Sequence, residues 1–311
     1  MPSLLTTILQ TGSTLVLDAT TGQRPCQSTA EEVVVCARPD RLTTILPMTV
    51  AGTQGTVLVE PSGPRYLACN LDFIARAGIV GEGPYPIGRV GPVEVIGART
   101  ELPVKILDQE FTRPIRWSQY RAVQSADCVI GPRAMRFRTV IFTLGRDRPD
   151  AVQTILPFDR YDAGRIYVTL PVGAAKLPTR IELAHAGSVL TAPAARLIAP
   201  TLGGTVTGPP REEVIIDGIV RPTRTIDLRQ PLRIGPVALS SLSVRVADYG
   251  RADKLQTLAP NELDATDETV VVRAKPEAPG AVRLLRVGRE ALTGCVSITV
   301  DMRKRVMTLR C

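Results

Sequence analysis

Hydrophobic and polar positions alternate in short runs along most of the chain, and glycine or proline ends most of the runs. Ile45–Val50 and Thr56–Val59 are two such runs, and the dipeptide Ala51-Gly52 between them predicts a tight hairpin turn. A helical pattern is confined to short segments such as Leu71–Arg76 and Ala192–Leu197. Short strands with frequent turn signals predict an all-β protein with short helices.

The order of these runs occurs twice, which predicts two homologous lobes. Nine residues separate the turn residue Gly52 from Pro61, and nine separate Gly173 from Glu182. We therefore expect an N-terminal extended arm with a small Cys loop at 1–41, a first lobe at 42–158 and a second lobe at 159–311. A polar stretch near 250–280, rich in Asp, Glu, Pro and Ala, is expected to be an insertion in the second lobe.

An apolar residue followed by glycine precedes a late strand in each half, as Ile130-Gly131 and Val287-Gly288. Glycine at this point lets a strand pass close beside another loop. In the first half, a segment rich in Gly and Pro at 81–93 lies between the first strands and Gly131. We expect it to be a long loop followed by a hairpin.

Together these features resemble the aspartic proteases of the retropepsin type. In that family an apolar strand delivers Asp-Thr/Ser-Gly and a helix follows, as strand, turn and helix follow here at Val57–Ile79 and again at 179–197. The resemblance covers residues 42–311. It implies two aspartic-protease-like β lobes with a cleft between them and a flap from the 81–93 region. Because one chain carries both lobes, we expect a monomer.

Neither copy of the motif contains the aspartate. With Gly63 on the motif glycine, the aspartate position falls on Pro61 and the middle position on Ser62; a shift by one residue places Glu60 there instead. In the second copy, the positions fall on Glu182, Leu183 and Ala184. The family's mechanism needs two close carboxyl groups that share one proton, and a glutamate displaces the group by one methylene.

We therefore expect a catalytically inactive protein that binds a peptide or protein segment in the cleft as an added strand. Candidate anchors are Tyr66, Tyr85, Trp117 and His185. This hypothesis predicts Pro61 opposite the second motif, with no second acid. One alternative is a divergent aspartic-type endopeptidase that uses Glu182 with Glu60. Another is a structural subunit of an exported assembly, with its cleft filled by residues 1–40.

Charge and composition argue against several classes of ligand and partner. The net charge is +8, and 33 of the 38 cationic residues are Arg, but they are scattered and only 4% of residues are aromatic. A nucleic-acid surface would show a basic stripe with interleaved aromatics, so none is expected. With a single His and no glycine-rich phosphate loop, we expect neither metal nor cofactor. The sequence contains no run of 18 apolar residues, so we expect no transmembrane segment.

Six cysteines suggest a disulfide framework. Cys295 and Cys311 bracket a run that a hairpin centred on Arg303 would fold back on itself, bringing the two thiols opposite each other. Cys26 and Cys36 could close a short N-terminal loop.

The protease resemblance also implies that Cys69 and Cys128 lie in neighbouring strands. Three bridges would indicate an oxidising compartment, periplasmic or secreted, whereas reduced buried thiols would not. The first nine residues lack a basic region and a long apolar stretch, so no signal peptide is evident. The segment Cys26 to Arg38 resembles one often found near the start of exported alphaproteobacterial proteins.

Overall fold

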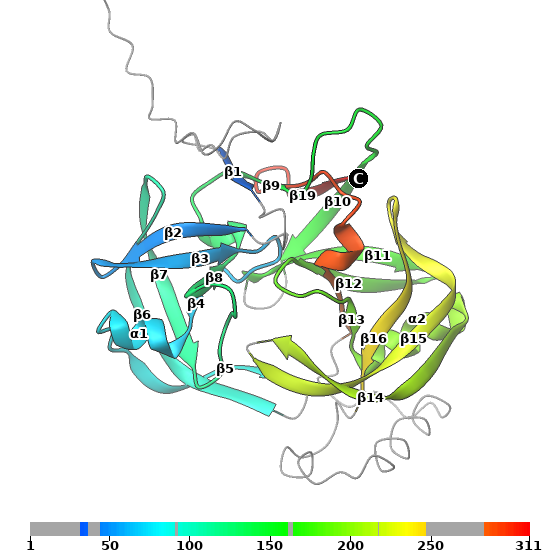
Figure 1. Cartoon of the computed structure of the whole chain (residues 1–311), viewed down its shortest axis with the longest axis horizontal. Helices are drawn as coiled ribbons and strands as arrows, with labels where there is room; N and C mark the ends of the chain where they lie inside the picture. Colours follow the sequence, from blue (N-terminus) through cyan, green and yellow to red (C-terminus); the bar gives the residue numbers. More distant parts are fainter. Residues whose placement is uncertain (1–31, 37–43, 91–92, 161–163, 217, 247–282) are drawn as a thin grey trace, which may run out of the picture.

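The computed structural model describes residues 32–36, 44–90, 93–160, 164–216, 218–246 and 283–311. These residues form an all-β fold with two short α-helices, α1 (Leu71–Arg76) and α2 (Ala192–Leu202), as the sequence predicts (Figure 1). Two 3-10 turns, at Pro132–Ala134 and Arg289–Leu292, follow the glycines Gly131 and Gly288. No helix in the described part of the chain is both long and apolar enough to cross a membrane.

The first half forms a seven-stranded sheet with the order β2-β3-β8-β4-β7-β6-β5. Its strands are β2 (Ile45–Val50), β3 (Thr53–Val59), β4 (Leu67–Cys69), β5 (Glu82–Val90), β6 (Val93–Ile106), β7 (Gln109–Ser118) and β8 (Cys128–Ile130). Figure 1 shows this sheet curling around α1, which buries Phe73 and Ile74 against it.

The second half belongs to a twelve-stranded sheet with the order β1-β9-β18-β19-β10-β11-β12-β17-β13-β16-β15-β14. Its strands are β1 (Glu32–Cys36), β9 (Thr139–Thr143), β10 (Gln153–Arg160), β11 (Ile166–Val172), β12 (Ala175–Glu182), β13 (Val189–Leu190), β14 (Gly204–Ile216), β15 (Ile219–Ile234), β16 (Val237–Arg245), β17 (Leu285–Gly288), β18 (Ser297–Asp301) and β19 (Val306–Arg310).

Seven strands of this larger sheet repeat the smaller one. The order β11-β12-β17-β13-β16-β15-β14 matches β2-β3-β8-β4-β7-β6-β5 strand for strand. The directions match as well, since β3–β8 and β12–β17 are parallel, as are β4–β7 and β13–β16. The chain therefore contains the same strand arrangement twice. The boundaries at residues 41/42 and 158/159 stay a prediction, because β9 and β10 both lie in the larger sheet.

Strands from both halves join in one layer. β9, which follows the strands of the seven-stranded sheet in the chain, pairs with β18 of the second half, and β10 pairs with β19. β1 adds to this layer in parallel with β9. The N-terminal arm is otherwise outside the described residues, as is the polar stretch near 250–280.

The 81–93 region was predicted to be a long loop followed by a hairpin. The hairpin is present, but Glu82–Val90, expected to lie in the loop, is its first strand, β5, which pairs with β6 through two register shifts. Pro84 and Pro86 lack the N–H that a central strand needs, but β5 is the last strand of its sheet, where proline is tolerated. The equivalent hairpin of the second half is β14–β15.

These two hairpins meet near their turns. A small apolar cluster, separate from the main core, combines Val90 and Val95 of β5–β6 with Val189, Ile215 and Ile219 of the second half. The hairpins of the two halves thus contact each other through a few apolar side chains, while the main core runs through both sheets.

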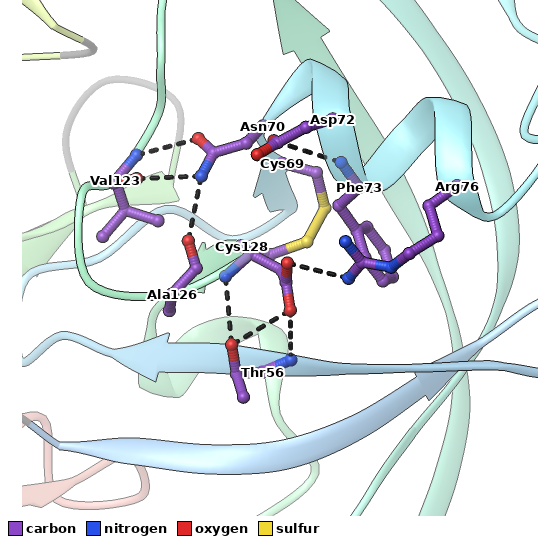
Figure 2. The surroundings of a disulfide bond; sticks show 10 residues. Thr56, Cys69, Asn70, Asp72, Phe73, Arg76, Val123, Ala126 and Cys128 are labelled. Carbon is purple, nitrogen blue, oxygen red and sulfur yellow. Dashed lines mark hydrogen bonds and ion pairs between the residues drawn. A yellow bond between two sulfur atoms is a disulfide. The ribbon is translucent and has the colours of Figure 1, made fainter.

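Two of the expected disulfides are confirmed. Cys69 and Cys128 face each other in the antiparallel pair β4–β8 and are bonded, as Figure 2 shows. Cys295 and Cys311 are bonded across the base of the β18–β19 hairpin. The expected Cys26–Cys36 pair lies outside the described residues, because Cys26 does.

The Cys69–Cys128 bridge sits in a polar network that anchors α1. Asn70 Nδ2 donates to the carbonyl oxygens of Val123 (2.8 Å) and Ala126 (2.9 Å), and Asn70 Oδ1 accepts from Val123 N (Figure 2). Asp127 Oδ1 accepts from Arg76 at the end of α1. The first helix is therefore tied at both ends to the loop that precedes β8.

Candidate interlobe site

Strand register identifies which residues of the two motif copies are equivalent. In β3–β8, Val59 pairs with Ile130, so Glu60 lies beside Gly131; in β12–β17, Glu182 pairs with Gly288. The hairpins that lead to these strands agree, because Val50 pairs with Thr53 and Val172 pairs with Ala175. Glu60, and not Pro61, is therefore the equivalent of Glu182.

This register differs from the sequence alignment that matches Gly52 with Gly173 and Pro61 with Glu182. The turn residue equivalent to Gly173 is Ala51, which has a positive φ of 49°, and not Gly52. Glycine is the usual residue at positive φ, which made Gly52 the natural match. The ungapped correspondence was thus wrong by one residue, whereas the alternative with Glu60 at the motif position agrees with the register; Pro61 is the equivalent of Leu183.

Glu60 reaches across to the second lobe. Its carboxyl oxygens accept hydrogen bonds from the backbone N–H groups of Leu183 (2.7 Å) and Ala184 (2.5 Å). The side chain is buried, with 3% of the residue exposed. Both oxygens of Glu60 are therefore engaged by the backbone of the opposite loop.

Glu182, also buried, faces arginines and a histidine instead. Arg180 Nε lies 3.1 Å from its Oε1, and His185 Nδ1 lies 3.2 Å from its Oε2. Arg165 is farther away, at 3.9 Å. Arg289 also contacts this loop, because its side chain donates a hydrogen bond to the carbonyl oxygen of Ala184 at 3.0 Å.

Pro61 explains why the two glutamates differ. A symmetric arrangement would have Glu182 accept from the N–H groups of residues 61 and 62, the equivalents of Leu183 and Ala184. Proline has no N–H. Ser62 N donates to the carbonyl oxygen of Ile181 at 3.2 Å. Glu182 therefore has no such pair of donors, and the cations take their place.

Ser62 links the lobes in both directions. Besides the bond from its N–H, its Oγ accepts a hydrogen bond from Ile181 N at 3.0 Å. Only 1% of Ser62 is exposed. This second motif position is a structural clamp between the two loops.

Close backbone packing holds the loops in place, as predicted for the two glycines. A Cβ on Gly131 would lie 2.2 Å from the carbonyl oxygen of Gly63, and one on Gly63 would lie 2.6 Å from that of Ile130. In the second lobe, a Cβ on Gly288 would lie 2.3 Å from the carbonyl oxygen of Gly187. Only glycine allows these approaches.

The electrostatics of the two glutamates are opposite. Burial, together with the negative charge of Glu182, raises the pKa of Glu60 to about 8, although the two backbone donors oppose this. The pKa of Glu182 is held far below its usual value despite burial, by the charges of Arg180 and Arg286 and by its contact with His185. Burial in turn lowers the pKa of His185. The expectation that no second acid lies near Glu182 is therefore wrong.

The predicted anchors fall in two places. His185 belongs to the Glu182 cluster. Tyr66 is buried just after the first loop, and Tyr85 lies on β5; the guanidinium carbon of Arg116 is 4.3 Å from the centroid of the Tyr66 ring and 5.5 Å from that of Tyr85. Trp117 is packed against Gly81, because a Cβ there would lie 2.3 Å from its ring.

Sequence reasoning missed the arginines. Arg180 and Arg286 are buried beside Glu182, and Arg116 stacks on the tyrosines. The one available signal was position: Arg180 stands two residues before Glu182 on an otherwise buried strand. Among the described residues, no group of His, Cys, Asp and Glu is arranged to hold a metal ion.

Comparisons with known proteins find no matching family or curated protein and only slight structural likenesses. No family model matches the sequence, and no curated protein matches it. Among solved structures, the retroviral protease-like domain of Ddi1 from Leishmania major matches 29% of this chain and 71% of that domain, with 19% identity and a TM-score of 0.22. The foamy viral protease-reverse transcriptase matches 29% of this chain and 11% of that protein, with 15% identity and a TM-score of 0.22. Likenesses this slight carry no argument.

Proposed function

We propose that this is a catalytically inactive, aspartic-protease-like protein that binds a peptide or protein segment between its two lobes. The observation that carries the proposal is the use of both Glu60 oxygens as acceptors for the backbone of the opposite loop. A carboxyl group held in this way acts as a structural bond between the lobes.

The chemistry of a two-carboxylate hydrolase requires more than two nearby acids. The pair must position a water molecule and exchange a proton with it and with the substrate. Glu60 and Glu182 are both buried, with 3% and 4% of each residue exposed, which leaves little carboxyl surface to contact a water in a cleft. The guanidinium of Arg180 also balances the charge of Glu182 at 3.1 Å, which weakens that carboxylate as a base.

Binding is favoured by the arrangement around these loops. β5 and β14 are the last strands of their repeated sheets, so each has one edge with no neighbouring strand among the described residues. Their hairpins meet through a small apolar cluster. A bound segment would add to one of these edges as a further strand, held by backbone hydrogen bonds. To let it in, the two hairpins would separate at the small apolar cluster.

One observation favours a second candidate, a divergent endopeptidase that uses Glu60 and Glu182. The two pKa values move in opposite directions from the usual value, and such a split is how paired carboxylates provide an acid and a base together. In this alternative, Glu60 would be the acid and Glu182 the base.

The deciding experiment offers the oxidised protein a complex peptide library from acid to neutral pH. Mass spectrometry then reads new peptide termini and, after washing, the retained peptides. Glu182→Gln and Glu60→Gln are run in parallel. We expect retained peptides and no new termini. Cleavage that both variants abolish would establish the peptidase and overturn the proposal. Neither cleavage nor retention would instead support a structural subunit.

We also propose a periplasmic or secreted location, which the two disulfides support because such bonds persist in oxidising compartments. Labelling of free thiols in protein taken directly from cells tests this. Unmodified cysteines are expected, and complete labelling of all six would contradict it.

A further inference from the structure

A stack of alternating aromatic rings and guanidinium groups crosses one face of the first lobe. The guanidinium carbon of Arg116, on β7, lies 4.3 Å from the centroid of the Tyr66 ring and 5.5 Å from that of the Tyr85 ring. The guanidinium carbon of Arg99, on β6, lies 4.4 Å from the centroid of the same Tyr85 ring. The order is thus Tyr66, Arg116, Tyr85, Arg99. The stack runs from the interlobe loop, just after Gly63, to the base of the β5–β6 hairpin.

The two arginines are placed where they repel each other. Arg99 and Arg116 are directly opposite in the β6–β7 pair, and like charges in such positions destabilise a sheet. Glu82 offsets this only weakly, because its carboxylate is 3.8 Å from Arg99 Nε and 86% of its side chain is exposed. An anion bound beside the stack, in contact with both guanidinium groups, would relieve the repulsion.

Arg116 is oriented but its polar edge is unsatisfied. Its Nε is buried and has no hydrogen-bond partner among the described residues. Stacking on rings fixes the plane of a guanidinium, so that less side-chain freedom is lost when a planar carboxylate binds its N–H groups in pairs. A buried donor without an acceptor also costs stability, which a ligand oxygen would recover.

We propose that Arg116 and Arg99, held by Tyr66 and Tyr85, form a carboxylate-binding site that selects peptides with an acidic side chain. This inference rests on the proposed function, since it names the class of segment that the protein binds. The planar fork of the guanidinium favours a carboxylate of Asp or Glu over a neutral amide of the same shape. The net charge of +8, from 38 Lys and Arg residues against 30 Asp and Glu residues, would speed the approach of such peptides.

Trp117, the only tryptophan, reports on this site because it follows Arg116 on β7. Its fluorescence is titrated at physiological ionic strength with acetylated, amidated hexaglutamate and with the matching hexaglutamine. We expect hexaglutamate to bind at least about tenfold more tightly, the size of one charged hydrogen-bond pair. Arg116→Gln should reduce this preference to about twofold or less, and Arg116→Lys, which keeps the charge, should lose most of it.

Arg233→Gln is the matched control, because it removes one exposed cation from β15 in the other lobe. It should leave the preference unchanged. The inference is overturned if the native protein shows no preference, if Arg116→Lys keeps the full preference, or if Arg233→Gln weakens it as much as Arg116→Gln does. Retention of neutral library peptides alone would refute acid selection and leave peptide binding intact, whereas retention of no peptide would refute both.

Discussion

Replacing Glu60 by Gln should change how the stability of this protein depends on pH. The pKa of Glu60 is raised from 4.5 to about 8 in the folded protein, chiefly by burial and by the charge of Glu182. Between these two values the folded state keeps a proton that the unfolded chain has released. The free energy of unfolding must therefore fall as pH rises through this window.

The size of the effect follows from the same linkage. One bound proton corresponds to about 1.4 kcal/mol per pH unit, so Glu60 alone should remove about 2.7 kcal/mol of stability between pH 5 and pH 7. Glutamine does not titrate and lacks this slope. The lowered pKa of His185 adds a contribution of opposite sign below pH 6.5, but both proteins share it and it cancels in the difference. Glu182 titrates below this window.

Urea unfolding at pH 5, 6, 7 and 8, with the disulfides intact and Trp117 fluorescence as the signal, measures this difference. The stability of the native protein minus that of Glu60→Gln should fall steadily over the series. Glu101→Gln, on an exposed position of β6, is the control for loss of one carboxylate. A difference that stays constant, or that grows with pH, would refute the electrostatic account of the interlobe site.

Three other changes test the fold around the site. Ser62→Ala should cost about 1–3 kcal/mol in urea unfolding, because it leaves the buried N–H of Ile181 without its acceptor. Gly131→Ala should destabilise by about 3 kcal/mol or more, since the new Cβ would lie 2.2 Å from a backbone oxygen of the facing loop; unchanged thermal unfolding would contradict the close approach. Replacing Cys69 and Cys128 together by Ala should lower stability by about 4 kcal/mol, from a sequence separation of 59 residues, and a loss below about 1 kcal/mol would contradict this.

Much of the fold could be predicted from local patterns. Strands that alternate in polarity, the helix Leu71–Arg76 and the hairpin between Cys295 and Cys311 all depend on neighbours in the sequence. The region 81–93 was predicted to be a long loop followed by a hairpin because it is rich in Gly and Pro, which normally interrupt strands. Its position at the edge of a sheet, which permits proline, depends on distant pairing that local patterns do not contain.

The candidate site could be predicted only in outline. Glu60 and Glu182 were both identified, but their correspondence depended on a turn whose glycine shifted by one residue between the two halves. The environments of the two acids depend on Arg180, His185 and the amides of residues 183 and 184, which tertiary packing brings together. Arginines are so frequent in this chain that no local pattern distinguished the buried ones from the rest.

The proline at position 61 has a consequence for the ancestry of this architecture. If the two lobes were separate, identical chains, every residue at one motif would occur at the other, and a proline at one amide position would remove its counterpart. Joining the lobes in one chain allows each copy to change alone. Here one copy has a proline that lacks a backbone donor, while the other has an arginine and a histidine beside its acid. Because one chain encodes both motifs separately, a substitution at one motif leaves the other unchanged. The hydrogen bonds of Glu60 and the charged residues around Glu182 can therefore be altered independently.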